Sequence, residues 1–133
     1  MTVRTLVLAL LGGLAAAGCG GNEGPTAGEL EVRLATPNSD DRAVRFLLGG
    51  ERTAVTAPAG TNYRVFTAPR SGDTVIVVVI APQGGRLAAG ALVRLSVPDT
   101  RQAASYRTTV QDVAATSYAQ RAVTGYALTV VKP

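Results

Sequence analysis

Side chains that commonly perform acid–base chemistry or bind metals are scarce in this chain. Its 133 residues include no histidine, and the single cysteine is Cys19. The commonest zinc ligands and the usual general base are therefore missing. The remaining route to an activated serine is a Ser–Lys pair, but the only lysine, Lys132, stands next to the C-terminus. That position is poor for a buried catalytic pair. We also expect no cofactor.

A pair of carboxylates that hydrolyses a glycosidic bond is the other catalytic possibility. The acidic residues available for it are Glu51, Asp73, Asp99 and Asp112. No spacing among these four singles out two that would face each other across a substrate. We therefore expect a protein that is not an enzyme.

The densest group of oxygen ligands is the stretch of residues 38–41, with the sequence Asn-Ser-Asp-Asp. Hard cations such as calcium bind carboxylate and carbonyl oxygens. The stretch lacks the alternating spacing and the distal glutamate of a calcium loop, and Asn and Asp also cap their own backbone in turns. We predict a turn here without a metal, and we keep Asp40 and Asp41 as speculative binding residues.

The four tyrosines could stack on sugar rings or pack against the core. Tyr63, Tyr106 and Tyr126 fall in phase with apolar neighbours, which favours packing against a sheet. Tyr118 lies outside these patterns and is the third speculative binding residue.

Two glycine pairs, Gly49-Gly50 and Gly84-Gly85, could belong to phosphate-binding loops or to turns. Neither precedes a predicted helix, so a phosphate-binding loop has no support. We predict hairpin turns at both places.

The charge distribution argues against nucleic-acid binding. Twelve of the thirteen basic residues are arginines, and from Arg33 to Arg121 they are spread singly. Removal of a leader with Arg4 leaves 12 basic and 9 acidic side chains, a net charge of 12 − 9 = +3. Nucleic-acid binders concentrate Lys and Arg on one face or in a run, so we expect no nucleic-acid partner.

The first residues have the pattern of an export signal. Arg4 precedes an apolar run over residues 6–17, which ends in small residues before Gly18 and Cys19. A run of this length is short for a membrane span and typical of a signal peptide. The ending resembles the bacterial lipobox, in which the cysteine receives a lipid and the leader is cut just before it. This resemblance implies cleavage between Gly18 and Cys19 and lipidation of Cys19.

Three segments follow from this interpretation: a signal peptide at 1–18, a lipidated cysteine with a Gly-rich tether at 19–28, and one domain at 29–133. Each buried methylene contributes about 0.8 kcal/mol, so two or three acyl chains hold a protein on a membrane permanently. We expect a lipid-anchored protein of the cell envelope. The residue after Cys19 is Gly20 and not the aspartate that resembles an inner-membrane retention signal, so the resemblance implies the outer membrane where the cell has two.

Period-2 alternation of apolar residues covers most of the chain after residue 29, which predicts strands. Short intervals between Pro and Gly breakers favour an all-β protein, a single antiparallel β-sandwich of about eight or nine strands. The β-branched run at 74–80 predicts a strand covered on both faces. The stretch of residues 113–120 is the one place that could hold a helical turn. The predicted breakers are Pro37, Gly49-Gly50, Pro58, Pro69, Pro82, Gly84-Gly85 and Pro98-Asp99.

Three segments resemble cohesin-type domains, which are jelly-roll sandwiches that bind other proteins. They are residues 30–34, 44–48 and 90–97, the last with residues 106–113 behind it. Cohesins continue the second segment with a Tyr-Asp pair, where this chain has Gly49-Gly50, so dockerin recognition is not implied. The resemblance implies a sandwich with a binding role.

We therefore expect a lipid-anchored, non-catalytic module that binds a protein or a glycan of the envelope. The alternative is a structural subunit that adds its edge strand to a neighbouring chain. A long unprotected edge strand would favour the subunit, and an exposed, chemically distinctive surface would favour the module.

Overall fold

The structure is a computed structural model that describes residues 24–133, so Gly18 and Cys19 lie outside the described residues. This part of the chain forms nine strands and one short 3-10 helix, η1. The elements are β1 (Gly28–Ala35), β2 (Asp41–Gly49), β3 (Ala54–Thr56), β4 (Arg64–Ser71), β5 (Thr74–Ile80), β6 (Gly90–Val97), η1 (Thr100–Ser105), β7 (Arg107–Ala115), β8 (Gln120–Arg121) and β9 (Ala127–Val131).

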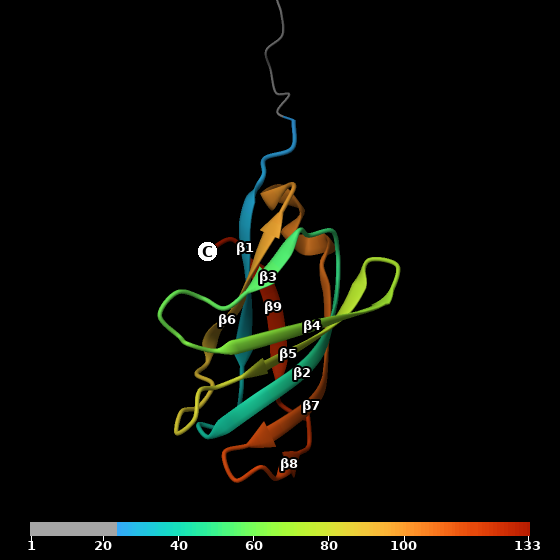
Figure 1. Cartoon of the computed structure of the whole chain (residues 1–133). Helices are drawn as coiled ribbons and strands as arrows, with labels where there is room; N and C mark the ends of the chain where they lie inside the picture. The colour runs from blue at the N-terminus through green and yellow to red at the C-terminus, as the bar shows by residue number, and fades with distance from the viewer. Residues whose placement is uncertain (1–23) are drawn as a thin grey trace, which may run out of the picture.

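The strands form two antiparallel sheets that pack face to face (Figure 1). One sheet has four strands in the order β3-β6-β1-β9, and the other has five in the order β4-β5-β2-β7-β8. The predicted all-β sandwich is confirmed. No helix within residues 24–133 is long and apolar enough to cross a membrane.

The core lies between the two sheets and is built from alternate residues of each strand. On β2, Val44, Phe46 and Leu48 are fully buried, and on β1 Leu30 and Val32 are fully buried. Side chains of successive strand residues point to opposite faces, so this period of two places one set of residues in the core. The residues that alternate with these core residues point outward and form the outer face of each sheet.

The prediction that both faces of β5 would be covered is wrong. Val77 and Val79 are fully buried in the core, but Ile76, Val78 and Ile80 are only half-buried. No described element packs over the outer face of the five-stranded sheet (Figure 1). A run of β-branched residues is compatible with a strand covered on one face and with a strand covered on both. The sequence alone therefore did not distinguish these two arrangements.

Both predicted hairpins at the glycine pairs are also wrong. Gly49-Gly50 connects β2 to β3, and Gly84-Gly85 connects β5 to β6, and each connection crosses from one sheet to the other. A tight hairpin instead joins β4 to β5 through Gly72 and Asp73, where Gly72 has φ +58°. Glycine adopts this left-handed conformation without steric cost.

The stretch of residues 113–120, which could have held a helical turn, contains no helix. β7 continues to Ala115 and turns back into β8. The one described helix is η1, which begins after Asp99, and the Asp99 side chain accepts a hydrogen bond from the backbone N–H of Arg101. Aspartate before a helix satisfies a free backbone donor in this way.

The folded part begins slightly before the predicted boundary at residue 29. β1 starts at Gly28, and the backbone N–H of Thr100 donates to the carbonyl of Thr26 at 2.8 Å. The N–H of Thr26 in turn donates to Asp99 at 3.4 Å. The last residues assigned to the tether therefore belong to the domain.

Candidate functional site

The outer face of the five-stranded sheet is the most distinctive surface of the domain. One row of paired residues crosses four strands, from Phe66 on β4 through Val78 on β5 and Arg45 on β2 to Asp112 on β7. Phe66 is 52% exposed. The neighbouring rows add further apolar residues, namely Ala43, Leu47, Ala68, Ile76, Ile80 and Ala114.

A shallow hollow of about 370 Å³ lies at the β7–β8 side of this face. Its floor contains the small residues Ala43 and Ala114, and Val78 lies at its end toward Phe66. Tyr118 and Gln120 line it as well. Small side chains flanked by larger ones leave room for a ligand group above the sheet.

A polar cluster forms one side of the hollow. The Arg45 guanidinium forms an ion pair with Asp112, and the Gln120 amide donates to the same carboxylate at 2.8 Å. The side chains of Arg45 and Asp112 remain 49% and 34% exposed. The hollow therefore combines an apolar floor with a few oriented polar groups, as binding sites commonly do.

Tyr118 is brought to this hollow by the turn between β7 and β8. Its side chain is 74% exposed, and its backbone φ is +70°. A left-handed conformation is uncommon for tyrosine, and such strain concentrates at functional sites. The Arg42 guanidinium lies 5.6 Å from the centre of the Tyr118 ring, a cation–π contact that holds the ring beside the sheet.

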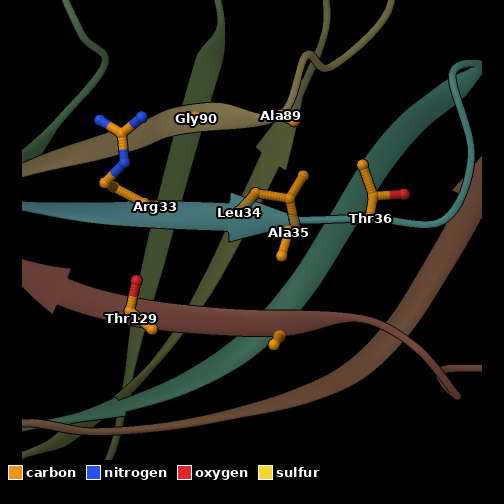
Figure 2. Close-up of a pocket in the computed structure, with 8 residues that line it drawn as sticks. Arg33, Leu34, Ala35, Thr36, Ala89, Gly90 and Thr129 are labelled. Carbon is orange, nitrogen blue, oxygen red and sulfur yellow. The ribbon is translucent and has the colours of Figure 1, made fainter.

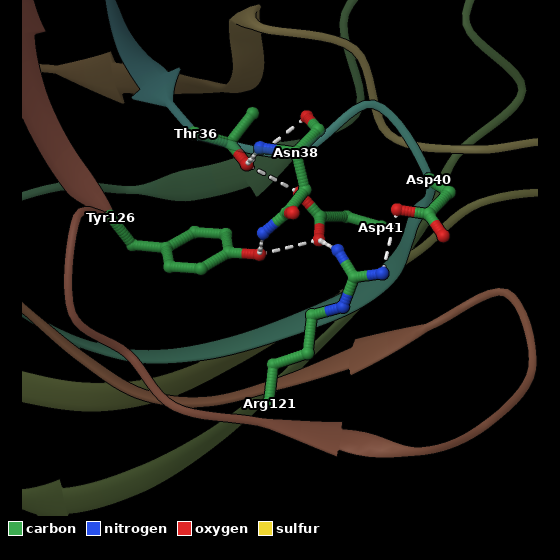
Figure 3. A network of polar contacts seen from close by, with 6 residues as sticks. All are labelled: Thr36, Asn38, Asp40, Asp41, Arg121 and Tyr126. Atoms are coloured by element: carbon green, nitrogen blue, oxygen red, sulfur yellow. Dashed lines mark hydrogen bonds and ion pairs between the residues drawn. The ribbon is translucent and has the colours of Figure 1, made fainter.

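Asp40 and Asp41 do not belong to this hollow, and their side chains form ion pairs with Arg121. Figure 3 shows Asp41 at the centre of a polar network, with its side chain fully buried. The Asp41 carboxylate accepts from Arg121 at 3.1 Å, from the Tyr126 hydroxyl at 2.6 Å and from Thr36 at 2.6 Å. Arg121 also contacts Asp40 at 2.6 Å.

This network supplies the buried Asp41 carboxylate with partners, without which burial of its charge would be costly. Hydrogen bonds with Tyr126 and Asp40 raise the pKa of Arg121. Thr36 follows β1 and Tyr126 precedes β9, so the network ties both sheets together at one end. Residues 36–40 connect β1 to β2. The Thr36 hydroxyl caps this connection by accepting from the backbone N–H of Asn38 at 3.0 Å, whereas the Asn38 and Asp40 side chains bind Tyr126 and Arg121.

The predicted packing of the other three tyrosines is confirmed. Tyr63, Tyr106 and Tyr126 are partly buried against the core. The Tyr63 hydroxyl accepts from the backbone N–H of Ala88 at 3.0 Å, and the Tyr106 hydroxyl donates to the carbonyl of Glu51. Burial raises the pKa of Tyr106. Each ring thus packs in the apolar interior while its hydroxyl finds a partner.

Two of the four candidate catalytic carboxylates line one hollow. Glu51 and Asp99 border a space of about 290 Å³ beside Tyr106. The Arg101 side chain and backbone bind Asp99 and hold the pKa of that carboxyl well below its usual range. A general acid of a glycosidase needs a raised pKa, so Asp99 is unsuited to that role.

The other two carboxylates lie elsewhere, each with an arginine. Asp112 pairs with Arg45, and Asp73 pairs with Arg107 at 2.9 Å. Lys132 is exposed just after β9. Within residues 24–133, no group of three His, Cys, Asp or Glu side chains could hold a metal ion.

Figure 2 shows a second hollow, of about 480 Å³, on the other sheet between β1, β6 and β9. Small and polar residues line it, among them Ala89, Gly90 and Thr129. Arg33 at its edge is already paired with Glu31 at 3.2 Å. This hollow contains none of the residues predicted as binding residues.

The chain matches no known family model, no curated protein and no solved structure.

Sequence reasoning found Tyr118 but missed the surface to which it belongs. Phe66, Arg45 and Gln120 were not singled out, because each occupies an ordinary place in an alternating strand. A usable signal was the apolar character of both faces of residues 74–80. In a sandwich of only two layers, such a strand has to leave one apolar face open.

Proposed function

We propose that this chain is a membrane-anchored, non-catalytic interaction module of the cell envelope, which binds a protein partner on the outer face of its five-stranded sheet. The observation that carries the proposal is the row from Phe66 to Asp112, with half-buried aliphatic residues on either side. Contiguous apolar surface with a polar rim is typical of protein-binding sites.

The composition of this face favours a protein over a glycan. Ile76, Val78 and Leu47 offer aliphatic surface in the middle of the sheet, where a partner's side chains would be desolvated. Phe66 at one side supplies the kind of aromatic anchor that carries much of the binding energy in protein interfaces. An ion pair such as Arg45–Asp112 contributes orientation more than affinity.

The experiment that tests the binding face is site-specific photo-crosslinking in cells. A photoreactive residue at Val78 should capture a protein, and one at Ser96 should not. Ser96 is the matched control because it is also half-buried, on the outer face of the other sheet. Equal capture at both positions, or capture at neither, would refute the proposed binding face.

Glycan binding is the second candidate, and the hollow beside Tyr118 favours it. An exposed ring next to Asp112 and Gln120 offers a stacking surface and hydrogen-bonding groups together. Tyr118→Ala should then abolish retention on immobilised cell-wall polysaccharide, while Tyr63→Phe, a change in the packed interior, should leave retention unchanged. If the wild-type protein passes through the polysaccharide unretarded, this candidate is dismissed.

The membrane anchor is proposed on the pattern around Cys19. Lipid on its thiol would hold the domain at the envelope surface, in the outer membrane of a cell that has two. The Cys19→Ser protein should leave the membrane fraction in a high-salt wash, whereas the wild-type protein should stay. Persistence of Cys19→Ser in washed membranes would show that lipid on this residue is not the anchor.

A further inference from the structure

β4 is the longest open sheet edge in the described part of the chain. The other three edge strands have three residues (β3), five (β9) and two (β8), whereas β4 has eight. β9 is also partly closed against the other sheet, because the Thr108 hydroxyl donates to the carbonyl of Leu128 at 3.3 Å. All residues of β4 except Val65 are exposed, and the β4–β5 hairpin projects from the sandwich in Figure 1.

An open edge of this kind is a template for another strand, and proteins restrict its use. Pro69 lies near the end of β4, where the pairing with β5 is also irregular between Pro69 and Ser71. The expected strand break at Pro69 is thus wrong, because an edge strand tolerates proline. These two features leave the segment from Arg64 to Ala68 as the regular part of the edge.

Arginines near the two ends of β4 disfavour pairing with a second copy of the chain. Antiparallel pairing of two β4 strands centred on Thr67 would bring Arg64 of each copy close to Arg70 of the other, which lies in the irregular stretch between Pro69 and Ser71. Like charges directly opposite each other destabilise a sheet. The same arginines would attract a strand that carries acidic residues in the corresponding positions.

The charge pairing in the rest of the domain leaves few acidic groups of the same chain for these two arginines. Seven of the eight acidic residues in the described range have an ion pair with an arginine: Glu29, Glu31, Asp40, Asp41, Asp73, Asp99 and Asp112. Arg64 and Arg70, like Arg42, Arg52 and Arg86, form no ion pair with an acidic side chain of residues 24–133. Among these five arginines, only Arg64 and Arg70 lie on the open edge strand. Arg70 is six positions after Arg64, which is about 20 Å along a strand.

We propose that β4 accepts an extended segment of a partner protein as a tenth strand, with acidic residues opposite Arg64 and Arg70 and apolar residues beside Phe66. This inference rests on the proposed function, since it specifies the chemistry of the protein partner. Main-chain hydrogen bonds would supply affinity and the two arginines the selection of sequence. The added strand would also extend the apolar outer face beyond Phe66.

Two designed peptides test the charge selection on the purified full-length protein. One has the sequence Glu-Thr-Val-Thr-Val-Thr-Glu, and its twin has Lys at both ends. Fluorescence anisotropy should show the acidic peptide binding about tenfold or more tightly than the twin, from two charge pairs across a strand. Equal affinity of the two peptides, or no binding of the acidic one, would overturn the inference.

Variants and a third peptide separate strand addition from simple charge attraction. The double variant Arg64→Glu/Arg70→Glu should reverse the preference between the two peptides. Arg86→Glu is the matched control, because Arg86 is exposed and likewise unpaired among the described residues but lies between β5 and β6. It should change nothing. An acidic peptide with proline at its centre should fail to bind, and its binding would overturn the strand model.

Photo-crosslinking at Thr67 in cells distinguishes this inference from the proposed function. Capture of a segment with acidic residues about six positions apart, lost in the double variant, would support it. Capture of a second copy of the chain at Thr67 would overturn it. If Val78 captures a protein and Thr67 does not, the inference about the edge fails and the proposed function stands. If neither captures one, both fail.

Discussion

The outer faces of the two sheets differ sharply, although their inner faces build one core. On the outer face of the four-stranded sheet, the residues of β1 include charged side chains that are paired, as in Glu29–Arg94 and Glu31–Arg33. On the five-stranded sheet the outward residues are mostly aliphatic or aromatic, with Ile76 and Val78 half-buried and Phe66 exposed. The core requires neither arrangement, so the apolar outer face has to be explained by something outside the core.

The difference follows from how strictly each strand alternates. β1 alternates Leu30, Val32 and Leu34 with charged residues, so only one of its faces is apolar. β5 has no charged residue at all. Exposed apolar surface favours aggregation unless a partner covers it. The outer face of the five-stranded sheet is therefore the better candidate for a functional surface.

The largest expected effect separates the inner and outer faces of the five-stranded sheet. Phe46→Ala should lower the free energy of unfolding by about 3–5 kcal/mol, because it leaves a cavity in the core. Phe66→Ala should lower it by less than about 1 kcal/mol, because the ring is 52% exposed. Urea unfolding of both variants measures the contrast. A similar loss for Phe66→Ala would mean that its ring serves stability, which would remove the main argument for a binding face.

A smaller effect is expected where the two sheets are joined, at the network around Asp41. Asp41→Ala would leave the Arg121 charge with only Asp40 and the Tyr126 hydroxyl without its carboxylate acceptor. Loss of one member of a buried charged pair costs about 3 kcal/mol at the lower end of the usual range. The midpoint of urea unfolding should fall accordingly. A midpoint within error of the wild-type value would show that the sheets keep their relative position without this network.

The smallest effect is expected on the outer face of the four-stranded sheet. Glu29→Gln breaks the ion pair with Arg94. The side chain of Glu29 is 51% exposed and that of Arg94 is 33% exposed. Exposed pairs contribute less than about 1 kcal/mol, and this face is not proposed to bind a partner. Unfolding and photo-crosslinking at Val78 should therefore both stay at the wild-type level. A loss of capture in Glu29→Gln would extend the binding surface to this sheet.

The strands and the core were predictable because alternation is a local property of the sequence. Val44, Phe46 and Leu48 alternate plainly, and in the structure they are fully buried. The connections were less predictable, since Gly49-Gly50 is compatible with a hairpin as well as with a crossing between sheets. Which of the two forms depends on distant strands that the local sequence does not specify.

The candidate site was predictable only in part, for the same reason. Tyr118 stood out by lying outside the alternating segments, but its neighbours Arg45, Asp112 and Gln120 come from strands that pair through long-range register. Asp41 had the opposite outcome: it was predicted to lie in a turn as a speculative binding residue, and the structure places it at the first residue of β2, where it is completely buried.

The attachment of Thr26 to Asp99 and Thr100 has a consequence for how the domain would stand on a membrane. Seven residues lead from Cys19 to Thr26, which reach about 25 Å at most. A lipid on Cys19 would therefore keep the end that carries η1 toward the bilayer and the β7–β8 turn away from it (Figure 1). In that orientation the apolar outer face of the five-stranded sheet would point parallel to the membrane plane. A partner would then reach it by lateral diffusion along the envelope surface.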